Sequence, residues 1–307
     1  MRRLRGAVSD YLTVCRALGF QLVHTERLLH QFVGFAEEAG AQSITTQLAL
    51  RWAMLPSGSP AWHAQRLGVV RCFAHWWQTI DPDTEVPPTD VLSARTRRAA
   101  PYLYSDADIA ALMSAAGVLR SPLAAATMRT FIGLVFSTGM RRGEALGLNR
   151  DDLDSSAGVL TVREAKFDKP RQLPLHTSTV AALVAYARQR DQLCPHPSTA
   201  AFFVSTTGAR LSASTVWGTF HTLLHQAGIG SRTPGCRPRI HDARHTFAVT
   251  TLLGWYRDGV DVQARLALLS AYLGHTDPSH TYWYLHAVPE LLTLVADRLQ
   301  RSAGAAS

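Results

Sequence analysis

Residues 273–286 read LGHTDPSHTYWYLH and place three histidines and two tyrosines within fourteen positions. Histidine titrates near neutral pH and serves as an acid, a base or a hydrogen-bond donor. A tyrosine hydroxyl beside such groups is a candidate nucleophile. Which chemistry uses this mixture, and which tyrosine carries it, depends on other stretches of the chain.

The composition of the 307-residue chain is that of a folded soluble protein, with 47% hydrophobic and 18% charged residues. It contains no run of about 18 or more uncharged apolar residues, so we expect no membrane segment. The opening MRRLRGAVSDYL lacks the apolar core of a signal peptide. The four cysteines are scattered without a CxxC pair, which favours reduced thiols over a zinc site or a disulfide framework.

The net charge of +8 and the pI of about 9.7 indicate a partner rich in phosphate. Arginine supplies nearly all of the 31 basic residues; the two lysines, Lys166 and Lys169, both lie in REAKFDKPR. Lysine differs from arginine in releasing its proton when its pKa is lowered. The pair therefore marks a candidate site of proton transfer.

The first eighty residues have the apolar spacing of amphipathic helices. One candidate spans 24–40 and ends at Gly40, with Leu28, Leu29, Phe32, Val33 and Phe35 on its apolar face. A second spans 60–80 and ends before Asp81-Pro82; we expect its Trp76-Trp77 pair to be core rather than a base-stacking platform. Residues 81–101 are rich in proline, polar and finally basic, which is typical of a linker.

The remainder of the chain predicts a second, larger helical domain. A capping box at 105–108 opens a helix over 106–117, and a longer apolar helix ends at Gly139. Residues 158–175 alternate between apolar and polar side chains on both sides of a charged turn, as in a β-hairpin. Three more helical patterns follow within 178–190, 212–228 and 241–259. We therefore predict a mainly α fold with a small β-sheet or hairpin, and two domains, 1–98 and 99–307.

Two further stretches carry candidate chemistry. STGMRRGEALGL places Arg141 and Arg142 after the glycine that ends a helix. An arginine at this position can donate two N–H groups to one phosphate. The alternative is a pair of surface arginines beside a helix cap. In RIHDARHTF, His241 and Arg244 are three apart and share a helix face. The same string is one substitution from the zinc-protease signature HExxH. That interpretation places a permanent cation within a turn of the metal, so we expect no metal site.

Together these stretches supply two arginines, a lysine, two histidines and a tyrosine. A phosphodiester attacked by a tyrosine hydroxyl gains negative charge, and fixed cationic donors stabilise that charge without a metal. A general acid must protonate the departing sugar oxygen. The set favours phosphoryl transfer from DNA to protein.

Roughly residues 100 to 300 resemble the tyrosine recombinase (phage integrase) family, through four motifs in order. TGMRRGEALGL is similar to its TGLRxxEL box, KFDKPRQLPL to its hairpin pattern KGxKxRxxPL, HDARHTF to HxLRHTF, and YLGH to its LGH box. In the family the nucleophile lies nine residues after the LGH histidine, three after a threonine and two before a histidine; Tyr284 fits each condition and Tyr282 fits none. The resemblance implies these catalytic residues: Arg141, Lys166, His241, Arg244, His275 and the nucleophile Tyr284.

Two positions depart from the family pattern. Ala243 replaces the leucine of HxLRH, and Phe167 replaces the glycine after the first lysine, which leaves Lys169 as the alternative general acid. The long link before LGH and the stretch TYWYLHAVPELL resemble transposon-type recombinases. We also expect DNA contacts from a set of basic residues: Arg95, Arg97, Arg98, Arg142, Lys169 and Arg171.

The resemblance further implies a 3′-phosphotyrosine intermediate with no cofactor, neither ATP nor metal. It implies an N-terminal core-binding domain, double-stranded DNA as partner, a homo-tetramer on DNA alone or beside sister recombinases, and a cytoplasmic, nucleoid-associated protein of bacterial type serving a mobile genetic element. Two alternatives remain: an architectural DNA-binding relative that does not cleave, and a type IB topoisomerase.

Overall fold

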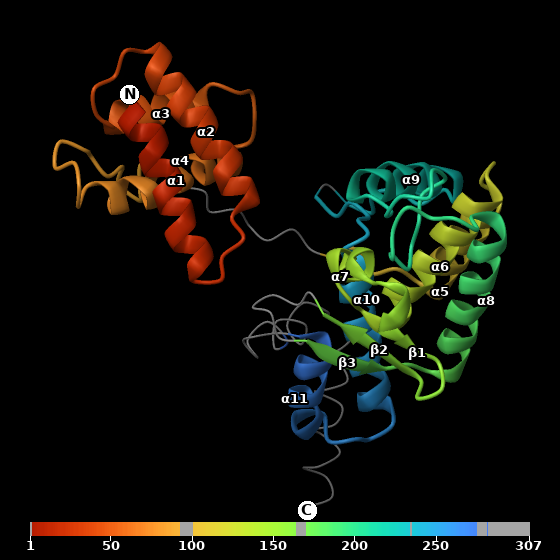
Figure 1. Cartoon of the computed structure of the whole chain (residues 1–307). Coiled ribbons are helices and arrows are strands. Elements are labelled where there is room, and N and C mark those ends of the chain that lie inside the picture. The colour runs from red at the N-terminus through yellow and green to blue at the C-terminus, as the bar shows by residue number, and fades with distance from the viewer. Residues whose placement is uncertain (1, 93–100, 164–169, 234, 275–280, 282–307) are drawn as a thin grey trace, which may run out of the picture. The chain divides into compact units, whose positions relative to one another are not determined.

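The computed structural model describes residues 2–92, 101–163, 170–233, 235–274 and 281. The chain divides into two compact units, Met1–Arg98 and Ala99–Ser307. Helices dominate both units, and one small sheet lies in the second (Figure 1). This confirms the predicted fold class. None of the helices in the described ranges is long and apolar enough to cross a membrane.

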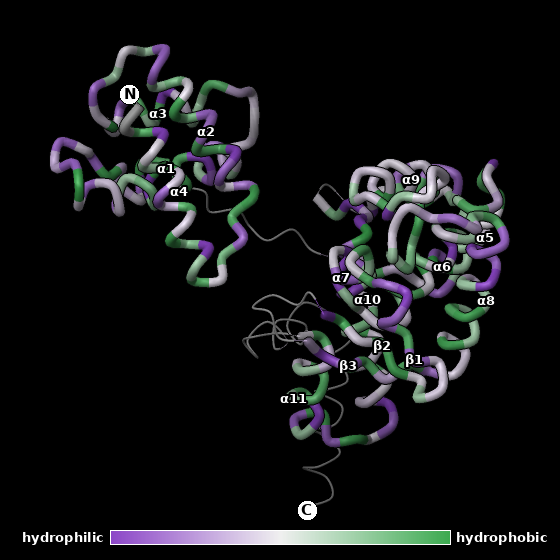
Figure 2. The backbone as a smooth tube through the Cα atoms, in the orientation of Figure 1, coloured by the Kyte–Doolittle hydropathy of each residue, from purple (hydrophilic) through white to green (hydrophobic). Residues whose placement is uncertain are grey.

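The first unit is built from four helices: α1 (Arg2–Ala17), α2 (Val23–Glu38), α3 (Thr46–Met54) and α4 (Pro60–Trp77). Hydrophobic and hydrophilic positions alternate along these helices (Figure 2), so that each turns one face to a shared core. The expected apolar face of α2 is buried except for Phe35, which is partly exposed and lies under Arg51; Ala36 is buried in its place.

The tryptophan pair at the end of α4 belongs to the core. Trp77 is buried and Trp76 is partly buried, and both rings pack against Phe73. This confirms the interpretation of the pair as packing residues. The helix ends at Trp77, three residues before the expected end at Ile80, because the amides of Thr79 and Ile80 donate to the carbonyls three residues back, those of Trp76 and Trp77, instead of four residues back.

The second unit opens with the predicted capping box. Ser105 Oγ accepts from the amide of Asp108, and the Asp108 carboxylate accepts from the amide of Ser105, at the start of α5 (Asp106–Gly117). The next helix, α6 (Pro122–Thr138), ends at Gly139 in the left-handed conformation, as expected. It packs against α5, α8 and α10, so its buried side chains form much of the core.

The predicted hairpin is part of a three-stranded antiparallel sheet, β1 (Leu153–Asp154), β2 (Val159–Val162) and β3 (Arg171–Pro174), in that order. A short helix α7 (Arg142–Gly147) and a 3-10 turn (Arg150–Asp152) lead into it. Val162 pairs with Arg171 in the register, so Arg171 is at the end of the ladder beside the connection that contains both lysines.

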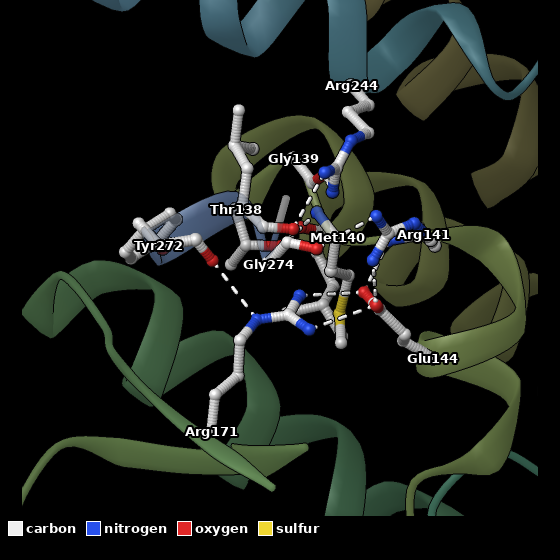
Figure 3. A network of polar contacts seen from close by, with 11 residues as sticks. Thr138, Gly139, Met140, Arg141, Glu144, Arg171, Arg244, Tyr272 and Gly274 are labelled. Carbon is white, nitrogen blue, oxygen red and sulfur yellow. Dashed lines mark hydrogen bonds and ion pairs between the residues drawn. The ribbon is translucent and has the colours of Figure 1, made fainter. Parts of the chain in front are cut away.

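The described part of the unit also contains α8 (Thr177–Leu193), α9 (Ala213–Gln226), α10 (Asp242–Arg257) and α11 (Val262–Leu273). The loop between α8 and α9 is anchored by buried Phe202 and Phe203, and Arg190 of α8 donates to the carbonyls of Ala201 and Phe202. The inner faces of α10 and α11 form a smaller apolar cluster of their own. The ends of α6 and α11 and the start of α7 meet near β3, where the polar side chains gather (Figure 3).

Candidate active site

Arg141 is held at the junction between α6 and α7. It occupies the N-cap position of α7, and its amide donates to Glu144 Oε2 at 2.8 Å. Its Nη1 donates to Glu144 Oε1 at 2.7 Å and its Nη2 to the Gly274 carbonyl at 3.0 Å. The side chain remains 31% exposed. A guanidinium held from two sides, with part of its surface open, is suited to receive an anion.

Arg171 lies on the other side of the same carboxylate (Figure 3). Its Nη1 and Nη2 donate to the two oxygens of Glu144 at 3.0 and 2.8 Å, and its Nε donates to the Tyr272 carbonyl at 3.1 Å. The side chain is 13% exposed. Each of its three nitrogens thus has a partner inside the protein, so the geometry does not favour the DNA contact expected for Arg171 from the sequence.

Glu144 is the shared acceptor of this network. Its side chain is 4% exposed, and burial alone raises the pKa of a carboxyl group. The hydrogen bonds and charge of Arg171, followed by those of Arg141, outweigh burial and hold the pKa of Glu144 below its ordinary value. The carboxylate therefore stays ionised at neutral pH and fixes both guanidinium groups.

Arg244 comes from the first turn of α10 and is buried, with 3% of its surface exposed. Its Nη1 donates to the Gly139 carbonyl at 3.0 Å and its Nη2 to the Leu273 carbonyl at 2.7 Å. It thereby ties α10 to the ends of α6 and α11 (Figure 3). A buried arginine with two of its donors fixed in this way has little freedom of rotation, which is the property required of a preorganised charge.

Three successive carbonyls at the end of α11 each accept a hydrogen bond from a different arginine. Tyr272, Leu273 and Gly274 are bound by Arg171, Arg244 and Arg141 respectively. The last carbonyls of a helix have no partner within the helix and carry partial negative charge. The three guanidinium groups satisfy these carbonyls and bring residues from α7, β3 and α10 to one point.

Two glycines permit this close approach. Gly139 has φ +61°, and a Cβ there would lie 2.5 Å from the Phe247 ring; Gly274 has φ +68°, and a Cβ there would lie 2.7 Å from Arg171 Nη1. A side chain at either position meets both an unfavourable backbone conformation and an occupied space. The glycine of the LG pair is therefore explained by packing against Arg171, and the glycine of the TG pair by packing against Phe247.

His241 precedes α10 at its N-cap position, three residues before Arg244. His241 is exposed at the surface, but partial desolvation of its ring by the surrounding protein lowers its pKa, and the positive charge of Arg244 lowers it further, with Arg239 and Arg141 adding smaller effects. The imidazole is therefore neutral at pH 7 and able to accept a proton. The charges of both Arg141 and Arg244 lower the pKa of His241. These three residues, all predicted from the sequence, therefore interact electrostatically.

Comparison with known proteins gives this constellation its context. The model of the phage integrase family matches residues 104–290. The chain belongs to the phage integrase family. The putative integrase/recombinase y4rB of Sinorhizobium fredii is 42% identical over 308 residues, 98% of each chain. The tyrosine recombinase XerD of Mycobacterium tuberculosis is 36% identical over 169 residues, which are 53% of this chain and 50% of XerD.

Solved structures of other family members share the fold. The Tn1549 transposon integrase in complex with transposon right end DNA has a TM-score of 0.66 at 18% identity, covering 96% of this chain and 99% of that one. XerH bound to its difH substrate has a TM-score of 0.63 at 19% identity, covering 89% and 78%. The chain is therefore a tyrosine recombinase, an enzyme of site-specific DNA recombination, as its motifs predicted.

In this tyrosine recombinase the zinc-protease interpretation of HDARH has no structural support. Asp242 is fully buried, and its carboxylate accepts from the Arg239 amide and guanidinium, so it is paired with an arginine and is not a free base beside a metal. The rings of His241 and His245 contact edge to face at 5.2 Å. Within the described ranges, no group of three or more His, Cys, Asp or Glu side chains could hold a metal ion.

Several predicted residues of the recombinase lie outside the described residues: Lys166, Lys169, His275, Tyr284, Arg95, Arg97 and Arg98. Their flanks are described. Val162 and Arg171 border the segment with both lysines, and Gly274 directly precedes His275. Arg142, predicted to contact DNA, is the first residue of α7 and is partly exposed.

The hydrogen bonds of Glu144 were not predicted from the sequence, and the DNA contact predicted for Arg171 remains a prediction. The position of Glu144, three residues after Arg141 at a helix start, was a usable signal because acidic groups at that position cap helices. Arg171 coincides with the arginine of the hairpin pattern KGxKxRxxPL, but the pattern does not identify its partners, because Glu144 and Tyr272 are 27 and 101 residues away in the chain.

Proposed function

We propose that this recombinase breaks DNA by transesterification at Tyr284. The Tyr284 Oη attacks the scissile phosphorus; a phosphorus–Oη bond forms and the bond to the 5′ oxygen breaks. The products are a 3′-phosphotyrosine and a 5′-hydroxyl. His241 assists removal of the tyrosine proton, and Lys166 gives a proton to the departing oxygen. The covalent bond conserves the phosphodiester energy, so the step needs neither ATP nor a metal.

The observation that carries this proposal is the convergence of Arg141 and Arg244 at the end of α11. Their Nη2 atoms donate to the adjacent carbonyls of Gly274 and Leu273. In the proposal these two arginines bind the non-bridging oxygens of the phosphate, where negative charge develops. Loss of one such donor is expected to lower the rate by about 10²–10³.

The histidines complete the proposed arrangement. The pKa of His241 is lowered first by partial desolvation and then by the charge of Arg244, so the neutral imidazole predominates at pH 7 and is competent to accept a proton. His275 follows Gly274, whose carbonyl is bound by Arg141, and we assign to it a hydrogen bond to the phosphate.

The partner proposed for the recombinase is double-stranded DNA, in keeping with the net charge of +8. We assign residues 1–98 to a core-binding domain and 99–307 to the catalytic domain. The lambda integrase was solved as a tetramer bound to a Holliday junction, and we propose a tetramer on DNA here, alone or with sister recombinases. Likeness to a transposon integrase supports service to a mobile genetic element.

Covalent trapping tests the proposed chemistry. The substrates are nicked suicide duplexes taken from the DNA that flanks the element carrying the gene, incubated with EDTA. The wild type is expected to give a gel-shifted protein–DNA adduct, and Tyr284→Phe to give none while binding the same DNA. A wild type that binds but gives no adduct contradicts the proposal and favours an architectural protein that does not cleave.

A type IB topoisomerase would give the same adduct, so a second assay separates the two. We expect the recombinase to leave supercoiled plasmids of arbitrary sequence unrelaxed and to react with plasmids that contain its own site. Relaxation of both plasmids at similar rates would favour the topoisomerase alternative.

A further inference from the structure

We infer that Arg171 is a positioning residue of the recombination reaction, which holds Arg141 and the end of α11 in register through Glu144 and the Tyr272 carbonyl. The inference rests on the proposed function and extends it to a residue that touches no reacting atom. It follows from three features of the described residues: the shared carboxylate, the charge of the network and the contact of Arg171 with Gly274.

The first feature is the way in which Glu144 is shared. Glu144 Oε1 accepts from Arg141 Nη1 at 2.7 Å and from Arg171 Nη1 at 3.0 Å. Glu144 Oε2 accepts from the Arg141 amide and from Arg171 Nη2, both at 2.8 Å. With both oxygens held by two elements, the carboxylate cannot swing about its own side-chain torsions. Arg141 is therefore oriented by a partner that Arg171 immobilises.

The second feature is charge. Arg141, Arg171 and Glu144 together carry a formal charge of +1. Without Arg171 the remaining pair would be neutral, and a buried carboxylate with one cationic partner would bind that partner more strongly. Arg141 would then be drawn away from the phosphate. Arg171 thus keeps the charge of Arg141 available to the substrate.

The third feature joins Arg171 to the segment that leads to the nucleophile. Its Nε donates to the Tyr272 carbonyl, and its guanidinium lies directly against Gly274, where an added Cβ would be 2.7 Å from Nη1. The Gly274 carbonyl in turn accepts from Arg141. Figure 3 shows Arg171 reaching from β3 toward both Glu144 and the end of α11. Strand β3, which follows Lys166 in the sequence, is thereby fixed to Arg141, the arginine proposed to bind the phosphate.

The experiment separates positioning from folding. Arg171→Met keeps most of the side-chain length and removes its donors, and Arg171→Lys restores the charge without the fork. Together with Arg171→Met, Glu144→Gln and the double variant Glu144→Gln/Arg171→Met form a double-mutant cycle. The matched control is Arg190→Met, because Arg190 is another buried arginine of the same unit that donates to a carboxylate and to main-chain carbonyls. Thermal stability, DNA affinity and the single-turnover rate of adduct formation are measured for each.

We expect Arg171→Met to form adduct about 10- to 100-fold more slowly at saturating DNA, with DNA affinity changed by about threefold or less, because a small displacement of a catalytic group is costly. Arg171→Lys should recover part of the rate. The double variant should be little slower than Glu144→Gln alone, since both changes act through one carboxylate. Arg190→Met should lower the melting temperature and leave the rate within about threefold of wild type.

The pH profile, compared with that of the destabilised control Arg190→Met, separates positioning from general loosening of the fold. Glu144 faces Arg141 from the start of its own helix and Arg171 from β3, and both lower its pKa. Without Arg171 this pKa rises, so the Arg171→Met rate should begin to fall at a higher pH than the wild-type and Arg190→Met rates. The double variant Glu144→Gln/Arg171→Met should not show this upward shift.

Three results would overturn the inference. The first is an unchanged rate of adduct formation in Arg171→Met, and the second is an equal loss of this rate in Arg171→Met and Arg190→Met. The third is a double variant whose loss of rate equals the combined losses of Glu144→Gln and Arg171→Met. If Arg171→Met does not fold, Arg171→Lys decides the question through its rate and its pH profile. Failure of the wild type itself to form an adduct would instead refute the proposed function.

Discussion

The Leu273 carbonyl accepts a 2.7 Å hydrogen bond from Arg244, a residue 29 positions earlier in the chain. The same guanidinium donates to the Gly139 carbonyl, 105 positions earlier still. One buried side chain therefore joins the ends of α6 and α11 to the start of α10. The motifs around Gly139, Arg244 and Gly274 are far apart in sequence and form one structure.

Replacing Arg244 by lysine tests the importance of the two hydrogen bonds that its guanidinium donates. A lysine keeps the charge, but its compact ammonium does not reproduce the planar guanidinium that bridges two carbonyls and reaches a phosphate. We expect Arg244→Lys to lower the single-turnover cleavage rate by about 10²–10³. Arg257→Lys, at the exposed end of the same helix, is the control and should leave the rate unchanged. Equal rates for the two variants would contradict the assigned role.

Adding a methyl group at Gly274 is expected to damage the site. The residue has φ +68°, and the new Cβ would press on the Arg171 guanidinium. We expect Gly274→Ala to lower the free energy of unfolding by about 1–2 kcal/mol and to slow cleavage more than tenfold. Chemical denaturation and adduct kinetics measure the two effects.

Gly254→Ala is the matched control for that variant. Gly254 lies within α10 with nothing within 4 Å of an added Cβ, and alanine favours a helix by about 0.5–1 kcal/mol over glycine. This variant should be as stable as wild type or more so, and fully active. A Gly274→Ala protein that matches it in both measurements would show that the close approach to Arg171 is unimportant.

Local signals in the sequence sufficed for several elements. Ser105 and Asp108 predicted the start of α5 because a capping box involves neighbouring residues alone. Gly139 predicted the end of α6 because its left-handed conformation is a property of one residue. The alternation around the lysines predicted β2 and β3, although the very short β1 gave no pattern of its own.

The interior of the site was harder to predict. A DNA contact is predicted for Arg171 as one of a set of basic residues, and its contacts inside the protein were not predicted. Its direction is set by Glu144 and by the end of α11, and neither partner is near it in sequence. Long-range ion pairs of this kind depend on packing and leave no local periodicity.

The capping box offers a test of stability that leaves the chemistry intact. Ser105→Ala removes the acceptor for the Asp108 amide, which should lower the free energy of unfolding by about 1 kcal/mol. Cleavage by the folded protein should be unchanged, since the hydrogen bonds described for Arg141, Arg171 and Arg244 lead to residues outside α5. Chemical denaturation checks the first expectation and adduct kinetics the second. A large loss of activity in this variant would require a link between α5 and the site.

His245 predicts how stability depends on pH. Burial, and then the neighbouring His241, lower the pKa of His245 to about 4 from its ordinary value of 6.5. Between these values the unfolded chain binds more protons than the folded one, so stability falls as pH decreases from about 6.5 to 4. Allowing for partial exposure, we expect a loss of about 1–2 kcal/mol from this residue.

Urea denaturation of wild type and His245→Gln at several pH values in this range measures the effect. The variant should show a shallower decline of the unfolding free energy toward acid. Parallel curves for the two proteins would show that His245 titrates alike in the folded and unfolded states.

The central claim is that DNA becomes bonded to Tyr284, and the most direct measurement is mass spectrometry of the trapped adduct. After digestion of protein and DNA, fragmentation of the peptide that contains both Tyr282 and Tyr284 locates the residual nucleotide. We predict the nucleotide on Tyr284, linked through its 3′-phosphate and formed in the presence of EDTA. A nucleotide on Tyr282, or on any other residue, would contradict the assignment of the nucleophile and the arrangement proposed around it.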